Sequence, residues 1–487
     1  MNHMEQEGTI TAAPPTARRL PPEYLGSAEF RGDHGVRYAY VAGSMYKGTA
    51  SQAMVARMAK AGLLAYFGTG GVRTERVEEV IRNLNGALGP DRAYGMNLLS
   101  APGAPHKEEE MVDLLLAHRV PRLEAASFIQ MSPALVRYRV TGLTRAPHGG
   151  VTAPHKVLAK VSRPETAEAF LSPPPAGIVR DLLRAGRVTA EEAELSTHIT
   201  MADDICAEAD SGGHTDQRPM VTLLPDIARL RDRMAAETVP RAASVRIGVA
   251  GGIGTPEAVA AAFMMNADFV LTGSINQCTV EAGTSDAVKD MLQQAGVQDT
   301  AIVPAGDMLE IGAKAQVLRK GLLFPTRANK LYELTLRHDS LEDLDERTAR
   351  QIQTKYFHRS FEEVWEETSE YLRKSDPDQL VAAEHDPKLR MILTFKWYFV
   401  HSSRLAMNGS AEQRVDYQIA CGPSLGALNS MLRGTSRESW RARHVDELAE
   451  LLMDGAAELW QRRLDETAAL PGVSGPASAH PATEGPP

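Results

Sequence analysis

Two glycine-bearing turns, close together in the sequence, have the residue types that bind a phosphate group. The first turn is Gly251 and Gly252, which follow an apolar run and precede Pro256, a residue suited to a first helical turn. The second turn is Gly273 and Ser274, at the end of the next apolar run. Glycines let backbone N–H groups approach an anion closely, and a helix start adds further N–H groups. Either turn alone could be an ordinary tight turn, but the two in succession favour a phosphate site.

One histidine has a context that suggests proton transfer. His214 follows Gly212 and Gly213, shortly after an apolar run that ends in acidic and small residues. Imidazole gains and loses a proton near neutral pH, which suits donation to a carbanion or abstraction from a substrate carbon. The two glycines would leave space for a flat ring. A lone histidine is more often a packing or surface residue, but this position favours a catalytic role.

The elements that must position these residues alternate regularly. Eight short apolar runs are predicted strands: 37–43, 63–68, 93–99, 122–127, 156–161, 203–208, 244–250 and 268–272. The segments between them have apolar residues at helical spacing, which indicates βαβ units around a buried parallel sheet. Eight strands predict an α/β fold of the (β/α)₈ TIM-barrel type, although an open doubly wound sheet would alternate in the same way. In barrels the loops after strands seven and eight commonly hold phosphate, and both glycine turns fall there.

The rest of the chain divides by composition. Residues 1–25 hold four prolines and few large apolar side chains, and the C-terminal end is rich in Pro, Gly, Ser and Ala, so 1–25 and 466–487 are predicted to be flexible tails. The barrel is expected over 26–305, with 163–200 inserted as a loop and helices over the barrel mouth. Residues 306–465 have heavy Glu, Lys, Arg and Leu content, which predicts a helical accessory domain.

Bulk composition narrows the class of protein. A formal net charge of −9 argues against a general affinity for nucleic acid, whose phosphates require clustered Lys and Arg. Cys206, Cys278 and Cys421 lack metal-binding spacing, so we expect no metal site. No secretory signal opens the sequence, and no apolar run approaches the roughly 20 residues that span a bilayer. We therefore expect a cytoplasmic enzyme that does not act at a membrane.

Several strings of the sequence resemble a known superfamily. GMNLL (95–99), SGGH (211–214) and AGGIG (250–254), with the end of the first strand, look like the nitronate monooxygenase (2-nitropropane dioxygenase) superfamily of FMN barrels. LEIGAKAQVL (309–318), PTRANKLY (325–332), WYF (397–399) and CGPSLG (421–426) are similar to one branch of it. That branch is the trans-acting enoyl reductase family of polyunsaturated fatty acid synthases and trans-acyltransferase polyketide synthases. The resemblance runs from about residue 37 to 453.

The resemblance implies an FMN enzyme that uses NADPH or NADH to saturate an α,β-enoyl thioester on an acyl carrier protein. It assigns proton donation to His214. It implies that the phosphate lies at Gly251, Gly252, Gly273 and Ser274. The remaining expected cofactor contacts, at the flavin ring, are Ala42, Gly43, Asn97, Ser127, Lys160, Gly212 and Gly213. For Lys160, a structural ion pair at the barrel rim is an equal alternative to a role beside the ring.

Other functions stay open on sequence alone. A nitronate monooxygenase-type oxidase of small nitroalkanes would use the same flavin with oxygen. A barrel without catalysis could serve as a docking scaffold within a synthase. The helical region could dock a carrier protein, cover the barrel mouth or mediate homodimerisation. Residues that could meet an acidic carrier protein are Arg319, Lys320, Arg327 and Lys330.

Overall fold

Eight parallel strands close into a barrel in the computed structural model, which describes residues 20–89, 93–147 and 149–470. The strands are β1 (Tyr40–Ala42), β2 (Leu64–Phe67), β3 (Gly95–Leu99), β4 (Arg122–Ala126), β7 (Lys156–Val161), β8 (Asp204–Glu208), β10 (Arg246–Ala250) and β11 (Val270–Thr272). β1 pairs with β2 on one side and with β11 on the other, which closes the sheet. Each strand falls inside one of the eight predicted apolar runs, so the (β/α)₈ barrel is confirmed.

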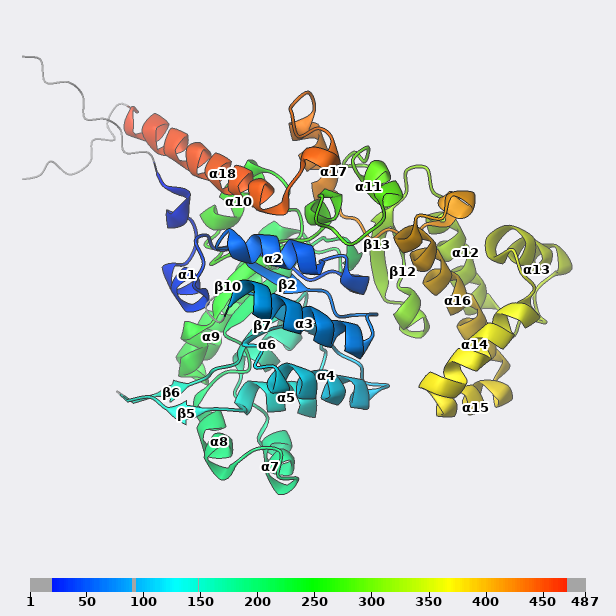
Figure 1. The fold of residues 1–487 in the computed structure, drawn as a ribbon, viewed down its shortest axis with the longest axis horizontal. Coiled ribbons are helices and arrows are strands. Elements are labelled where there is room, and N and C mark those ends of the chain that lie inside the picture. Colours follow the sequence, from blue (N-terminus) through cyan, green and yellow to red (C-terminus); the bar gives the residue numbers. More distant parts are fainter. Residues whose placement is uncertain (1–19, 90–92, 148, 471–487) are drawn as a thin grey trace, which may run out of the picture.

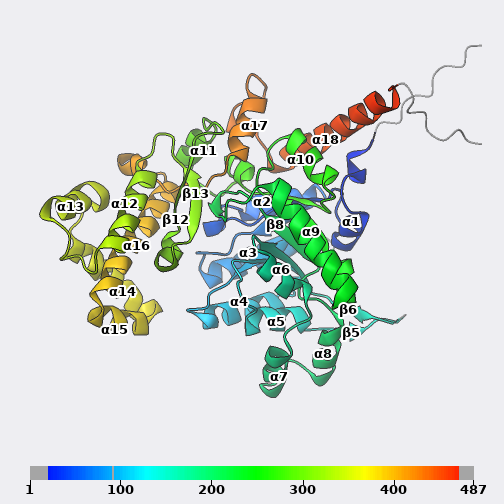
Figure 2. The ribbon, with the colours of Figure 1, turned by 180° about the vertical axis from the view of Figure 1, so that it is seen from behind.

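Helices cover the outside of the strands, as Figures 1 and 2 show from opposite sides. On α3 the buried residues Val77, Val80, Ile81 and Leu84 recur every three or four positions, which turns one apolar face toward the sheet. The covering helices are α2 (Gln52–Lys60), α3 (Thr74–Leu88), α4 (Pro105–Ala117), α5 (Pro133–Val140), α6 (Pro164–Leu171), α9 (Met220–Glu237) and α10 (Pro256–Met264). α1 (Ala28–His34) lies at the amino ends of the strands, where His34 pairs with Asp204. α11 (Asp286–Leu292) packs on the turn Ser274–Cys278 that follows β11.

The segment 163–200 lies on the flank of the barrel, and its expected position over the barrel mouth is wrong. After α6 it forms α7 (Ala176–Arg184) and α8 (Ala190–Leu195), seen at the bottom of Figure 1. α7 packs against α5, and α8 packs against the hairpin of β5 (Thr144–Arg145) and β6 (Val151–Thr152). The reason is that α7 has an apolar side that buries Val179 and Leu182 among these neighbours.

A second hydrophobic core lies beside the barrel, within residues 300–417; we call this part the accessory unit. β12 (Thr300–Pro304) and β13 (Lys314–Leu318) form an antiparallel sheet with β9 (Gly213–His214), which comes from the barrel loop after β8. Its helices are α12 (Phe324–Arg337), α13 (Glu346–Gln351), α14 (Phe361–Ser375), α15 (Pro377–His385) and α16 (Pro387–Asn408). The composition of the sequence predicted helices in this region but did not predict this sheet. The first strand, β12, also begins before the expected domain boundary at residue 305.

The last two helices return to the barrel, so the expected helical unit 306–465 is in fact two parts. They are α17 (Ser424–Leu432) and α18 (Val445–Ala468). α18 packs along α10, and its residues Leu448, Leu452 and Met453 belong to the barrel core rather than to the accessory core. The helices approach closely because α18 has a glycine there: a Cβ on Gly455 would lie 2.6 Å from Pro256.

The predicted tails fall mostly outside the described residues, at 1–19 and 471–487. Within the described part, Pro22–Tyr24 form a short 3-10 helix, and α18 continues to Ala468. No helix of the described residues combines the length and the apolar character that crossing a membrane requires. Across the same residues, no three His, Cys, Asp or Glu side chains come together in a way that could hold a metal ion.

Candidate active site

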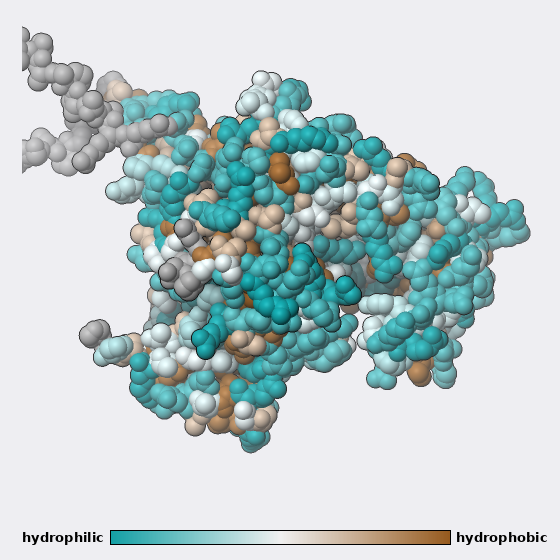
Figure 3. All heavy atoms as spheres, in the orientation of Figure 1, coloured by the Kyte–Doolittle hydropathy of each residue, from teal (hydrophilic) through white to brown (hydrophobic). Residues whose placement is uncertain are grey.

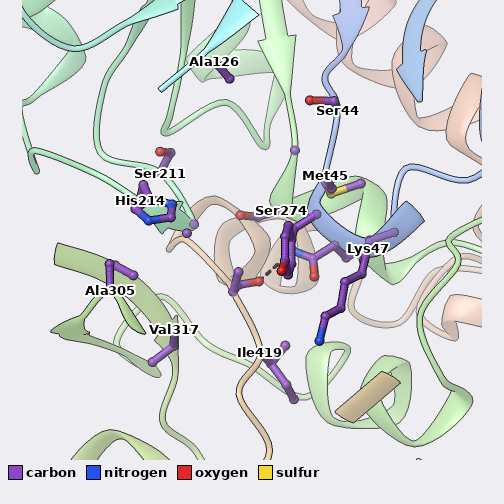
Figure 4. Close-up of a pocket in the computed structure, with 18 of the residues that line it drawn as sticks. Ser44, Met45, Lys47, Ala126, Ser211, His214, Ser274, Ala305, Val317 and Ile419 are labelled. Atoms are coloured by element: carbon purple, nitrogen blue, oxygen red, sulfur yellow. Dashed lines mark hydrogen bonds between the residues drawn. The ribbon is translucent and has the colours of Figure 1, made fainter. Parts of the chain in front are cut away.

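A cavity of about 460 Å³ opens at the carboxyl ends of the barrel strands. The barrel forms one side of it, and η6 (Gly306–Ile311), β13 and α16 of the accessory unit form the other. In Figure 3 the surface is hollowed between the barrel and the accessory unit, and Figure 4 shows the cavity at close range. The predicted site residues that line it are Asn97, Ser127, Lys160, Gly212, Gly213, His214, Gly251, Gly273 and Ser274.

Three predicted site residues do not line the cavity. Ala42 is fully buried within β1, and a Cβ on Gly43 would lie 2.5 Å from the Leu271 side chain, so both stand behind the cavity wall. The first residue after β1 to reach the cavity is Ser44. Gly252 is exposed next to Gly251, with open space where its side chain would be.

The two glycine turns meet a third segment that sequence reasoning left without a role. Gly251 has a φ of +87°, a left-handed conformation that favours glycine, and a Cβ there would lie 2.7 Å from the backbone of Ala209. At Gly273 no neighbouring group would meet a Cβ, so this turn stays open. The Ser274 Oγ accepts a hydrogen bond of 2.9 Å from the backbone N–H of Gly422.

Gly422 belongs to the segment 421–424, which leads into α17. Ser424, the last residue of this segment and the first of α17, lines the cavity. It also lies against the turn after β10, because a Cβ on Gly254 would be 2.3 Å from the Ser424 carbonyl oxygen. The amino end of α17 is therefore close to both glycine turns, and helix N-termini attract anions. The string CGPSLG marked this segment as a family feature, but nothing in the sequence placed it beside residues so much earlier in the chain.

Lys160 forms buried ion pairs inside the barrel. Its Nζ lies 3.2 Å from Glu208 Oε1 and 3.6 Å from Glu124 Oε1. Glu124 is fully buried and also accepts hydrogen bonds from the backbone N–H and the hydroxyl of Ser44. Burial lowers the pKa of Lys160, but Glu208 and Glu124 outweigh burial and raise it above its ordinary value. Lys160 is therefore an ammonium ion at the floor of the cavity. The structural ion pair that the sequence offered as an alternative is present, and it is made with Glu208 and Glu124.

Asn97 is fixed by the neighbouring loop. Its side-chain oxygen accepts hydrogen bonds of 2.7 Å from both the backbone N–H and the hydroxyl of Thr69. Its amide nitrogen makes no hydrogen bond within the described part of the chain. Because Thr69 fixes the side-chain oxygen, the donor end of Asn97 remains available to the cavity that the residue lines.

His214 is held at the junction between the barrel and the accessory unit. It lies in β9 and pairs with Ala315 of β13, so the accessory sheet fixes its backbone. Its Nε2 lies 2.9 Å from Asp307 Oδ1, in η6 of the accessory unit. The backbone carbonyl of Asp307 in turn accepts a hydrogen bond of 3.2 Å from Lys396 of α16. Asp307 is the functional candidate that sequence reasoning missed.

The carboxylate of Asp307 changes the proton affinity of His214. Desolvation lowers the pKa of His214, but the hydrogen bond and the negative charge of Asp307 outweigh it and raise the pKa above its ordinary value. The His214 side chain remains 45% exposed, so it is reachable from the cavity. The arrangement therefore shifts the equilibrium toward the protonated imidazole, the form that can donate a proton.

The predicted carrier-protein contacts all have partners within the chain: Arg319 donates a hydrogen bond to the Gln298 carbonyl, Lys320 pairs with Asp299 and Lys330 pairs with Glu333. Arg327 forms an ion pair with the buried Asp416 and lies over the ring of Tyr356, with 4.9 Å between its guanidinium carbon and the ring centroid. Arg327 is consequently engaged within the accessory unit rather than free for a partner. Arg319 and Lys320 are exposed, and the Lys330 side chain is 41% exposed.

The sequence is similar to one known protein family model and to known biosynthetic proteins. Residues 338–417, within the accessory unit, match the family model of the inserted helical domain of acyl-carrier-protein S-malonyltransferase. The chain is 49% identical over 462 residues to the polyketide biosynthesis protein PksE of Bacillus subtilis, a match that covers 95% of this chain and 59% of that protein. It is 41% identical over 414 residues to a polyunsaturated fatty acid synthase component of Thraustochytrium, covering 84% of this chain and 28% of that component.

A solved structure matches over its whole length. The enoyl reductase domain of MlnA, from the macrolactin biosynthesis cluster of Bacillus amyloliquefaciens, superposes with a TM-score of 0.88 at 44% identity. The match covers 92% of this chain and 100% of that domain. By contrast, the two curated relatives above are longer proteins, of which this chain spans only a part.

The barrel, the cavity at its strand ends and this relative define the chain as a barrel oxidoreductase of the enoyl reductase type. More narrowly, it belongs to the trans-acting enoyl reductase family of polyketide and polyunsaturated fatty acid synthases. The family resemblance drawn from the sequence is thereby confirmed.

Proposed function

We propose that the chain is an FMN-dependent enoyl reductase that uses NADPH to saturate α,β-unsaturated acyl thioesters carried by an acyl carrier protein. The observation that carries the proposal is the position of His214, which lines the same cavity as the glycine turns after β10 and β11 and is held by Asp307. A candidate acid and a candidate anion site in one cavity of about 460 Å³, a volume typical of a cofactor site, support the proposal.

Unsatisfied polar groups in the cavity support the fit of a flavin. The Ser211 Oγ and the Gln418 Oε1 are buried, line the cavity and have no hydrogen-bond partner within the described residues. Buried polar groups are normally paired, so these two require a ligand or water. A flavin has both donors and acceptors along its ring edge and side chain, which suits this mixed set.

The residues that would hold FMN follow from these contacts. Gly251, Gly273 and Ser274 would hold the phosphate, with the start of α17 at Ser424 beside them, whereas Gly252, also predicted here, lies outside the cavity. The ring would lie within reach of Asn97, Ser127 and Lys160, with Gly212 and Gly213 leaving it space. When bound, FMN supplies two-electron exchange between a nicotinamide and an activated alkene.

The chain itself supplies the proton and the enclosed space. His214 would donate a proton from its imidazole to the α-carbon of the enoyl thioester. Asp307 acts through His214, keeping its ring oriented and protonated. Phe399, Val400 and Met407 of α16 line the cavity opposite the barrel, and their apolar surface excludes water. Covering the barrel mouth is thus one role that the accessory unit is placed to perform.

The substitution Asp307→Asn is expected to move the alkaline limb of the pH profile of kcat/KM to lower pH. Asp307 raises the pKa of His214, so removing its charge lowers that pKa and depletes the protonated acid at a lower pH. Activity should therefore fall severalfold more at pH 8 than at pH 6. The control is Asp299→Asn, which removes a carboxylate that pairs with Lys320 outside the cavity. A uniform loss of activity at all pH values would contradict the role of Asp307 in raising the pKa of His214.

The proposed function is tested by anaerobic spectroscopy of the purified protein. We expect a yellow protein whose flavin band is bleached by NADPH and restored by the crotonyl thioester of an acyl carrier protein. A yellow protein that ignores the thioester but consumes oxygen with a nitronate would instead be an oxidase. A colourless protein that cannot be reconstituted with FMN would contradict the flavin assignment itself.

A further inference from the structure

Lys47 lines the cavity on the side opposite His214, as Figure 4 shows. It belongs to η2 (Tyr46–Gly48), the turn that follows β1, and its side chain extends toward α16. Its Nζ donates a hydrogen bond of 3.0 Å to the hydroxyl of Ser403 on α16. An ammonium group has three donors, and no acceptor of the described residues takes the other two.

The charge of Lys47 is not neutralised. No Asp or Glu of the described residues lies within ion-pair distance of it, whereas Lys160 on the cavity floor has two carboxylates nearby. The charged group that acts on Lys47 is the guanidinium of Arg404, on α16, which has the same sign. Burial, and then Arg404, lower the pKa of Lys47 to about 8. Arg404 itself pairs with Glu367 at 3.4 Å and keeps a half-exposed side chain at the rim.

The backbone holds Lys47 in a conformation that non-glycine residues rarely adopt. Its φ is 55° and its ψ is 31°, in the left-handed region. The turn is fixed by hydrogen bonds from the backbone N–H groups of Lys47 and Gly48 to the carbonyls of Gly70 and Gly68, of 2.7 and 3.1 Å. Such strain persists where the surrounding structure enforces it, and it is concentrated at ligand sites.

We propose that Lys47 and Ser403, with Arg404 at the rim, bind a phosphoryl group of an incoming reactant. An unpaired, partly buried ammonium is costly unless it meets an anion, and lysine is a common phosphate ligand. The flavin phosphate is assigned to the turns after β10 and β11, so this subsite is left for another group. The inference rests on the proposed function, which supplies two candidates: the phosphopantetheine arm of the carrier protein and the nicotinamide dinucleotide.

The subsite is tested by anaerobic calorimetric titration of the FMN-loaded protein, with the flavin reduced beforehand by dithionite so that NADPH binds without transferring hydride. The probes are 4′-phosphopantetheine, pantetheine without the phosphate, and NADPH. They are titrated into the wild type, Lys47→Met and Lys47→Arg. The control variant is Lys60→Met, at the exposed far end of α2. A charge-assisted contact is expected to give a tenfold or larger difference in affinity, at roughly 1.4 kcal/mol per factor of ten.

Two results would support the subsite, and each would identify which reactant carries the bound phosphoryl group. If it binds the carrier arm, Lys47→Met loses most of the preference for phosphopantetheine over pantetheine, and Lys47→Arg keeps it. If it binds the nicotinamide nucleotide, Lys47→Met loses about tenfold in NADPH affinity and the phosphopantetheine preference is unchanged.

Two other results would overturn the inference. One is unchanged affinity of Lys47→Met for phosphopantetheine and NADPH, and the other is loss of FMN from Lys47→Met, which would assign Lys47 to the flavin instead. Failure of the wild type to bind FMN or to be reduced by NADPH would contradict the proposed function. That result is seen in the wild type, so it is distinguishable from the two results for Lys47→Met.

Discussion

Replacing His214 with alanine is expected to lower the reduction of a carrier-bound enoyl thioester by about 10²- to 10⁴-fold, the usual worth of a general acid. The imidazole lines the cavity, lies 2.9 Å from Asp307 and has a pKa raised by that carboxylate, so it is placed and charged to donate a proton. Without it, the α-carbon must take its proton from water. The flavin should remain bound, because the phosphate turns belong to β10 and β11.

The two half-reactions separate this role from a general loss of structure. Stopped-flow absorbance under anaerobic conditions should show that NADPH reduces the flavin of His214→Ala at the wild-type rate. The subsequent reoxidation by a crotonyl thioester of the carrier protein should be slow. His385→Ala, an exposed histidine in the last turn of α15, serves as the matched control and should behave as wild type. Wild-type reoxidation by His214→Ala would remove the histidine from the mechanism.

The barrel and its glycine turns could be predicted because their signals are local. A buried parallel strand is a short apolar run, and each run lies next to the helix that follows it, so β10 and β11 and the turns after them were predicted from contiguous residues. The same holds for His214 and its preceding glycines. The closed barrel then brings the ends of all eight strands together, which puts these separate turns around one cavity.

The parts that could not be predicted depend on contacts between distant residues. Asp307 is an ordinary loop acid in the sequence, and it meets His214 only because β13 pairs with β9, far apart along the chain. The periodicity of α18 indicates an amphipathic helix, but not which core receives it. Its apolar face could have packed on the accessory unit; instead Leu448 and Leu452 pack on the barrel.

The accessory unit is consequently part of the active site rather than an appendage. It supplies Asp307 to the acid, Ser403 to the proposed phosphoryl subsite and the apolar wall of α16 to the cavity. A barrel without it would retain the phosphate turns but would lack the partner that raises the pKa of His214. Under the proposed function, we therefore expect thioester reduction to require residues 300–417 because they hold the candidate acid, independently of any carrier-protein docking.

Lys160→Met is expected to lower the free energy of unfolding by about 3–5 kcal/mol, the cost of leaving a buried charge without its partner. The ammonium of Lys160 lies between Glu208 and Glu124, and Glu124 is fully buried. Methionine fills nearly the same space, so packing changes little and the lost charge dominates. Lys160→Arg keeps the charge and should cost less. Urea unfolding of the apoprotein measures this effect without the flavin.

Comparison with the FMN-loaded protein then separates the two roles of Lys160. If the ion pairs were its whole contribution, apoprotein and loaded protein would lose the same free energy of unfolding. We expect the loaded Lys160→Met protein to lose more, because a ligand that binds only the folded state stabilises it by an amount that rises with the logarithm of its binding constant. That excess measures the contact with the ring. An apoprotein of Lys160→Met as stable as wild type would contradict the ion-pair argument, since Glu124 would then tolerate burial with only Ser44 as its partner.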